Sequence, residues 1–143
     1  MLTNLFWVAF GSAVGGSLRY LVTYGFTHLS KPFGYEEISR QSTYWSVLSI
    51  NLGGCFLIGI IAAFFLIGTT GKIVTTNSAL WLFLCVGVLG GYTTFSSFGL
   101  HAVEFFIDQR IWAGILYVTL SVVGGIACSL GGFYIGRFIS LHF

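Results

Sequence analysis

Four long apolar stretches alternate with shorter polar segments along the chain. The apolar stretches cover about residues 5–26, 46–67, 79–106 and 112–136. Each reaches the ~20 residues that an α-helix needs to cross about 30 Å of hydrocarbon. We therefore expect an all-α membrane protein with four transmembrane helices, organised as a single domain over residues 1–143.

Tryptophan placement supports these boundaries. One tryptophan lies within a few residues of the start of each span, and the four are Trp7, Trp45, Trp81 and Trp112. At such positions the indole ring lies in lipid while its N–H stays near water. The first stretch lacks a basic start, is too long for a signal peptide and contains Arg19, so we expect it to be retained as a helix.

Composition narrows the class of function. Only 7% of the residues are charged, against roughly a quarter in a soluble domain, which excludes a water-exposed surface. The net charge of +2 gives no indication of nucleic-acid binding. The sequence shows no nucleophile with a base, no carboxylate pair and no metal-ligand spacing, so we do not expect an enzyme. The cysteines are expected to be small packing residues: Cys55, Cys85 and Cys128.

The connections predict how the spans are oriented relative to one another. The longest polar segment, residues 27–45, joins the first two spans, and we expect it to include a short interfacial helix. Residues 68–78 form a shorter connection, and the segment from Asp108 to Arg110 allows only a tight turn. Successive helices should therefore alternate in direction.

Basic residues near the span ends are almost balanced between the two sides. One side has Lys72 and Arg137; the other has Lys31, Arg40 and Arg110, with Arg19 as a possible fourth. This bias is too weak to fix one orientation. A chain that inserts both ways and pairs with an inverted copy of itself would show this balance, and so would a protein that simply has few charges.

Glycine is frequent, at 20 of 143 residues. It recurs in small-xxx-small pairs, which are Gly11/Gly15, Gly87/Gly91, Gly125/Ser129 and Gly132/Gly136. Such pairs let helix backbones approach closely. Because four helices enclose too little volume for a pore, we expect these faces to pack a second subunit as well as each other.

Polar side chains inside the spans are functional candidates, because they are costly in lipid. They are Arg19, Asn51, the run from Thr93 to Phe98, His101 and Glu104. His101 and Glu104 are three residues apart, so they could form either a proton relay or a hydrogen-bonded pair near the wet end of the third span.

The third span contains a poor helix-forming segment over residues 90–99. A break near residues 90–94 would free backbone carbonyls and indicate an ion site, whereas an unbroken helix would have its Thr and Ser side chains bonded to the preceding turn. Phe95 and Phe98 lie on nearly one helical face. Ring edges can solvate an anion, although packing and lipid contact are the commoner roles of such rings.

Three motifs in this order resemble the Fluc family of fluoride channels, also called CrcB. They are Arg19-Tyr20 preceded by Gly11 and Gly15, the segment from Asn51 to Phe56, and the segment from Gly90 to Phe98. The resemblance extends over all four spans. It implies a passive, fluoride-selective channel of the plasma membrane, in which an antiparallel, dual-topology dimer with two pores exports fluoride from the cytoplasm.

The resemblance also implies roles for particular residues. The Asn51 amide would donate to fluoride, and Phe95 and Phe98 would present ring edges to it. Ser96, Ser97 and Tyr117 would line the polar path, with Arg19 at the vestibule. The backbone carbonyls of Gly90 and Thr93 would bind a central structural Na⁺. The partner would be an inverted copy of the chain or a paralogous subunit.

The chain departs from the family pattern at three places. Ser12 stands where the family has a second glycine, Gly99 and His101 replace a hydroxyl residue and a glutamate, and the 27–45 segment is long. Two other functions stay open at this point. A small dual-topology, proton-coupled multidrug transporter would need a carboxylate within the membrane, and a non-conducting membrane subunit would have no need for Asn51, Phe95 and Phe98.

Overall fold

The computed structural model describes residues 1–30, 36–67 and 78–142. Within these ranges the chain is helical, and four of its helical segments are long and apolar enough to cross a membrane, which confirms the predicted spans. Three of them are α1 (Leu2–Ser30), α2 (Glu36–Ile67) and α6 (Ile111–His142). The remaining span consists of α3 (Ala79–Trp81), the π-helix η2 (Leu82–Leu89), α4 (Gly90–Tyr92) and α5 (Phe95–Ile107).

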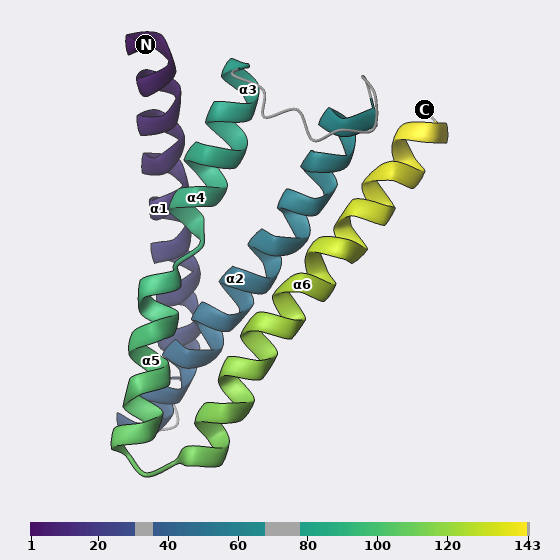
Figure 1. The fold of residues 1–143 in the computed structure, drawn as a ribbon. Coiled ribbons are helices and arrows are strands. Elements are labelled where there is room, and N and C mark those ends of the chain that lie inside the picture. Colours follow the sequence, from purple (N-terminus) through teal and green to yellow (C-terminus); the bar gives the residue numbers. More distant parts are fainter. Residues whose placement is uncertain (31–35, 68–77, 143) are drawn as a thin grey trace.

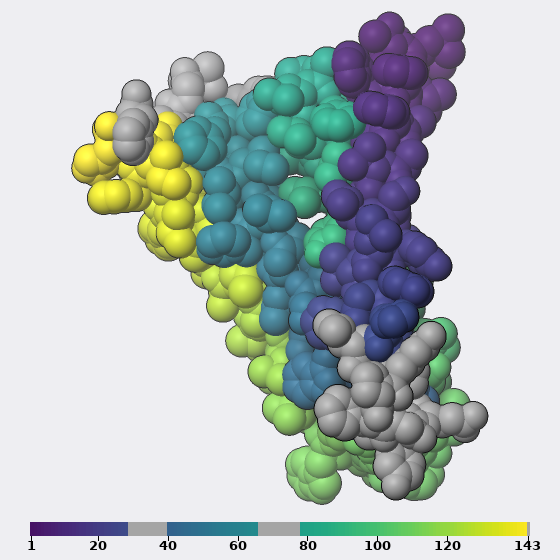
Figure 2. Space-filling view, turned by 180° about the vertical axis from the view of Figure 1, so that it is seen from behind, coloured from purple at the N-terminus to yellow at the C-terminus, as the bar shows by residue number. Residues whose placement is uncertain are grey.

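Successive spans alternate in direction, so both termini lie at the same end of the molecule (Figure 1). The spans converge at the end where α5 turns into α6, and they fan apart toward the termini, as both views show (Figures 1 and 2). Large apolar side chains are exposed on every span, among them Phe10, Phe64, Phe95 and Phe138. Such a surface suits contact with lipid or with another protein chain.

The expectation for residues 27–45 is wrong in its described part. Instead of a long connection with a short interfacial helix, α1 continues to Ser30 and α2 already begins at Glu36. Polar helix-forming residues can extend a helix beyond the lipid, where water satisfies their side chains. Residues 31–35 and 68–77, which include most of the predicted second connection, lie outside the described residues.

The turn between α5 and α6 is as tight as predicted. The Asp108 N–H donates to the Glu104 carbonyl at 2.9 Å, and the Gln109 N–H donates to the Phe106 carbonyl at 3.1 Å. Gln109 has a φ of 57°, in the left-handed region that ends many helices. Arg40 forms an ion pair with Asp108 at 3.0 Å and so ties the first turns of α2 to this end of the bundle.

Glycine pairs bring helix backbones into contact within the chain. A Cβ added at Gly11 would lie 2.9 Å from the Gly87 Cα, and one added at Gly91 would lie 2.6 Å from the Ser12 carbonyl oxygen. On the other side of the molecule, Gly132 lies against the Phe56 carbonyl of α2, and the Ser129 hydroxyl donates to the Cys55 carbonyl at 3.0 Å. The small-xxx-small pairs therefore close α1 onto the third span and α6 onto α2.

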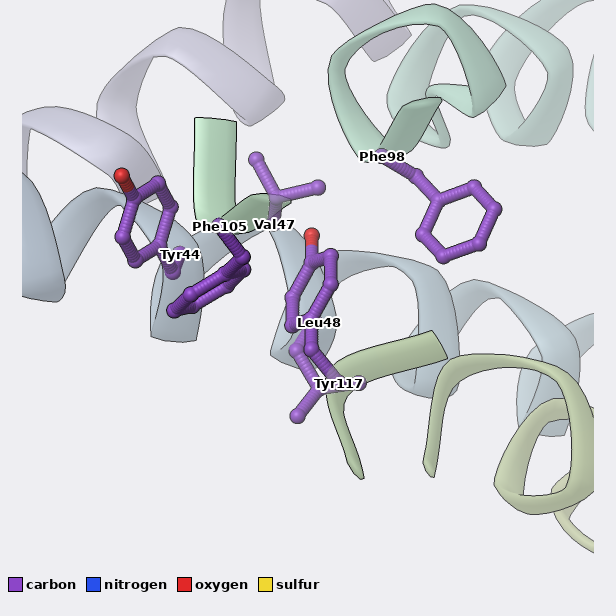
Figure 3. Packing of buried hydrophobic residues seen from close by; sticks show 6 residues of the cluster. All are labelled: Tyr44, Val47, Leu48, Phe98, Phe105 and Tyr117. Atoms are coloured by element: carbon purple, nitrogen blue, oxygen red, sulfur yellow. The ribbon is translucent and has the colours of Figure 1, made fainter. Parts of the chain in front are cut away.

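A cluster of buried side chains fills the convergent end (Figure 3). Its members are Tyr44, Val47, Leu48, Phe98, Phe105 and Tyr117. Ring centroids of Tyr44 and Phe105 are 4.5 Å apart, and those of Phe98 and Tyr117 are 5.7 Å apart. Aromatic contacts at such distances stabilise helix packing beyond their buried area. The cluster fixes α5 against α2 and α6, just beyond the irregular part of the third span.

Candidate functional site

The third span is broken, and the unbroken alternative is excluded. Its first part ends at Tyr92, Thr93 and Thr94 have extended backbones with ψ of 158° and 111°, and α5 begins at Phe95. The break is thus confined to the last two residues of the predicted 90–94 segment. It lies at membrane depth, where every freed backbone group needs a partner within the protein, a bound ion or enclosed water.

Asn51 of α2 bridges the break. Its Nδ2 donates to the Thr94 carbonyl at 3.1 Å, and its Oδ1 accepts from the Thr94 N–H at 2.8 Å. A continuous helix would pair that N–H with the Gly90 carbonyl. Asn51 therefore replaces one helical hydrogen bond, and an amide has two N–H donors, so one of them remains for another acceptor.

The hydroxyls after the break gather around Thr94. The Thr94 Oγ1 accepts from the Ser97 N–H at 3.2 Å, which caps α5, and donates to the Ser97 Oγ at 3.0 Å. The Ser96 Oγ lies 3.2 Å from the same atom. Capping by a threonine one residue before the first helical turn explains why α5 starts at Phe95.

Arg19 of α1 reaches the break from the opposite side. Its Nη1 donates to the Thr93 carbonyl at 3.3 Å. The Thr94 N–H, which would bond the Gly90 carbonyl in a continuous helix, donates to Asn51 instead. The two carbonyls expected to bind Na⁺ therefore differ: that of Thr93 accepts from Arg19, and that of Gly90 has lost its helical donor. Both remain hard oxygen ligands with a lone pair to spare, which suits a hard cation. Among the described residues no cluster of His, Cys, Asp or Glu side chains could hold a metal ion.

An open groove of about 500 Å³ lies between the break, α2, α5 and α6, and we call it the Asn51 groove. Its lining residues are Asn51, Cys55, Thr93, Thr94, Phe95, Phe98, Ser121, Val122, Gly125, Ile126, Ser129 and Leu130. It brings Asn51, Phe95 and Phe98 together. It also includes Ser121 and Ser129, which sequence reasoning missed. Ser121 follows Tyr117 by four residues and Ser129 follows Ser121 by eight, and this spacing along α6 is the signal that could have found them.

The two phenylalanines are not equivalent. Their ring centroids are 5.4 Å apart, but Phe95 is 82% exposed whereas Phe98 is 9% exposed. Phe98 packs on Tyr117 in the buried cluster (Figure 3), and Phe95 projects away from the chain. Tyr117 lies behind Phe98 and is absent from the residues that line the groove.

A second cavity, of about 310 Å³, lies on the other side of the break between α1, α2 and α5, and we call it the Arg19 cavity. Its lining residues are Gly16, Arg19, Tyr20, Thr23, Thr43, Val47, Thr94, Ser97 and His101. The predicted site residues are thus divided between two cavities. Thr94 lines both of them.

The proposed pairing of His101 with Glu104 is wrong. The hydrogen bond of His101 joins its Nδ1 and the Tyr117 Oη, which are 3.3 Å apart. His101 is buried between α2 and α6, while Glu104, almost one turn later on α5, is only partly buried. The three-residue spacing places both side chains on one side of α5. The imidazole, however, packs against the Tyr44 ring and is hydrogen-bonded to Tyr117 instead of Glu104.

Comparison with known proteins gives consistent matches over nearly the whole length. Residues 6–133 match the model of the family described as "CrcB-like protein, Camphor Resistance (CrcB)". The "Fluoride-specific ion channel FluC" of Agrobacterium fabrum is 35% identical over 136 residues, covering 95% of this chain and 98% of the relative. The protein of the same name from Helicobacter pylori is 31% identical over 137 residues, covering 95% of each chain. The one from Haemophilus ducreyi is 28% identical over 137 residues, covering 96% of this chain and 94% of the relative.

Proposed function

The chain belongs to the CrcB-like family, and we propose that it is a passive, fluoride-selective ion channel that lets fluoride leave the cytoplasm. The observation that carries this proposal is the break in the third span, bridged by Asn51 and flanked by the Asn51 groove and the Arg19 cavity. Such a channel is not an enzyme, since the ion crosses without a bond being made or broken.

The Asn51 groove supplies the kind of donors that a small, strongly hydrated anion needs. The second amide hydrogen of Asn51 and the ring edges of Phe95 and Phe98 lie along it, whereas the hydroxyls of Ser121 and Ser129 already donate to backbone carbonyls. Several weak donors along a path admit an ion and also release it, whereas one strong cation would trap it. No lysine or arginine is among the described residues that line the groove.

The groove needs a second wall, and an inverted copy of this chain would provide one. Phe95 is 82% exposed at the rim, and the glycine pairs are already used within the chain, so the remaining apolar surface is free to meet a partner. An antiparallel, dual-topology dimer would contain two such paths. The almost balanced basic residues support insertion in both orientations. A paralogous subunit could take the same place.

A structural Na⁺ would be held by the Gly90 and Thr93 carbonyls of the two subunits. The lost helical hydrogen bond of Gly90 supports this site. When bound, the cation would lower the electrostatic cost of an anion nearby. Arg19 donates to one of the same carbonyls and holds it in place.

Fluoride export through a passive path has a simple driving force. Hydrogen fluoride is a weak acid that crosses a bilayer in neutral form and ionises in a near-neutral cytoplasm. An inside-negative potential then favours exit of the anion by about 2.3 kcal/mol per 100 mV. This requires that the chain lie in the plasma membrane.

The two rival functions find less support. Proton-coupled exchange of cations needs a carboxylate within the membrane, but the four acidic residues of the chain, Glu36, Glu37, Glu104 and Asp108, all lie at or near span ends. A non-conducting subunit would not require an open groove lined by Asn51 and hydroxyls. Neither rival is favoured by relatives that are named fluoride-specific ion channels.

The direct test is anion efflux from liposomes that contain only this chain. Fluoride should leave them and chloride should not. Equal chloride efflux, or an absence of fluoride efflux, would contradict the assignment of a fluoride channel formed by this chain alone. Adding two lysines to one side should fix the orientation and abolish efflux until an oppositely fixed copy is co-expressed, as dual topology requires.

A further inference from the structure

His101 occupies a buried position that the proposed pore does not use. It is 7% exposed, and its ring makes an edge contact with Tyr44 of α2 at a centroid distance of 4.8 Å. Its Nδ1 lies 3.3 Å from the Tyr117 Oη of α6. The ring is therefore held from two sides, and one of its nitrogens is already engaged.

The direction of this hydrogen bond follows from the partners of Tyr117. The buried Tyr117 hydroxyl has no other hydrogen bond among the described residues. If the His101 Nδ1 carried the proton, the Tyr117 O–H would be a buried donor without an acceptor, which is costly. The hydroxyl therefore donates to Nδ1. A neutral imidazole with an accepting Nδ1 carries its proton on Nε2.

By elimination, the Nε2 of His101 faces the Arg19 cavity. Among the described residues, no buried side-chain nitrogen or oxygen lacks a hydrogen-bond partner. The one hydrogen bond of His101 uses Nδ1, so Nε2 is reachable from outside the protein, and the cavity that His101 lines is that of Arg19. An N–H donor thus faces the same space as the Arg19 guanidinium.

The chemistry of the Arg19 cavity favours an anion. Its wall includes a guanidinium, the His101 ring and the Ser97 hydroxyl, and no carboxylate is among its described lining residues. The charged and titratable groups around His101 are Arg19 and Tyr20 of α1, Tyr44 of α2, Glu104 of α5 and Tyr117 of α6. The cavity also contacts Thr94, which lines the Asn51 groove on the far side of the break.

We propose that His101 binds the permeating anion directly, donating its Nε2–H to a fluoride ion in the Arg19 cavity, while the Tyr117 hydroxyl fixes the tautomer that makes this possible. The proposal rests on the proposed fluoride channel and adds a binding position before the break. Ligand-facing imidazoles are commonly held in one tautomer by a hydrogen bond to their other nitrogen, as here.

A pair of substitutions separates this role from simple packing. His101→Gln places an amide N–H near the position of Nε2, whereas His101→Asn places its amide near Nδ1 and removes the donor from the cavity. In the liposome assay we expect His101→Asn to lower fluoride efflux about tenfold and His101→Gln to lower it less than about threefold, because a hydrogen bond to a charged group contributes on the order of a tenfold change. Equal loss in both would overturn the proposal, while absence of efflux from the unsubstituted chain would contradict the channel itself.

A spectroscopic measurement needs no substitution at His101. In ¹⁵N NMR of the histidine-labelled protein, added fluoride should shift the His101 Nε2 signal and leave the exposed His28 and His142 unchanged, and the neutral ring should show the Nε2–H tautomer. Tyr117→Phe should mix the two tautomers. A His101 signal that does not respond to fluoride, or that responds equally to the same concentration of chloride, would overturn the proposal even if efflux is normal.

Discussion

The Asn51 groove and the Arg19 cavity meet at Thr94, yet their walls differ in charge. The groove is open, mostly apolar and free of charged side chains among its described lining residues, and the serine hydroxyls in it are already bonded to backbone carbonyls. The wall of the cavity includes a guanidinium and an imidazole. A charged cavity can attract an anion from water, whereas a nearly uncharged groove can pass it on.

The difference shows that the break is the boundary between the two cavities. Asn51 holds Thr94 from the groove side, and Arg19 holds Thr93 from the cavity side. Two adjacent extended residues are therefore fixed by two different helices. Fixing them keeps the guanidinium on the cavity side of the break and out of the Asn51 groove, where it would trap the ion.

Removing the Asn51 bridge should have the largest effect, because it disturbs both sides of the boundary. Asn51→Ala leaves the Thr94 N–H and carbonyl without their partners, and we expect fluoride efflux from liposomes to fall about 100-fold, at roughly tenfold for each lost hydrogen bond. Asn51→Asp is the matched control, since it retains the acceptor for the Thr94 N–H but loses the amide donor. Normal efflux in Asn51→Ala would show that conduction does not depend on the bridge between Asn51 and Thr94.

Substitution of the two phenylalanines should affect different properties, with Phe98 important for stability and Phe95 for conduction. Phe98→Ala creates a cavity in the buried cluster and should destabilise the protein by about 3 kcal/mol, which thermal unfolding in detergent would measure. Phe95→Ala removes an exposed ring and should leave the unfolding temperature within a few degrees of that of the unsubstituted chain, while fluoride efflux falls about tenfold, because a ring-edge donor is lost. Similar unfolding temperatures for both variants would contradict the assigned difference in burial.

Charge in the Arg19 cavity should matter most when fluoride is scarce. Arg19→Gln should lower efflux about tenfold at low fluoride concentration and less at high concentration, because the guanidinium attracts the ion rather than selecting it. Arg19→Lys retains the charge and should give an intermediate rate. If Arg19→Gln also admits chloride, the cavity selects ions as well as attracting them.

The smallest effect is expected at Ser121 in the groove. Its hydroxyl donates its one hydrogen to the Tyr117 carbonyl at 2.7 Å, so no hydrogen is left for an anion in the groove. Ser121→Ala should therefore lower efflux less than about twofold, because no donor to the anion is removed. A loss as large as that of Asn51→Ala would show that the groove depends on one strong position.

Much of the architecture was predictable from the sequence because a membrane restricts the possible structures. Apolar length predicted the four spans, and the poor helix-forming run before Phe95 indicated the break without deciding between it and an unbroken helix. The helix ends near residues 27–45 were missed, since polarity marks the edge of the lipid and not the end of a helix. The hydrogen-bonded pairs Asn51–Thr94 and His101–Tyr117 could not be predicted from the sequence. Each joins two helices, and the rotation of a helix about its own axis is determined by its packing against its neighbours.

The contact between Gly11 and Gly87 has a consequence for biosynthesis. The two glycines touch in the finished protein but are about 75 positions apart in the chain. At synthesis rates of about 5–20 residues per second, α1 must wait several seconds in the bilayer for its partner to be made. During that time Arg19 has no carbonyl at the break to bind and must reach toward the lipid headgroups. Because α6 is made after the third span, α1 can dock while α6 is still being synthesised, and the packing of α6 on α2 is the later step.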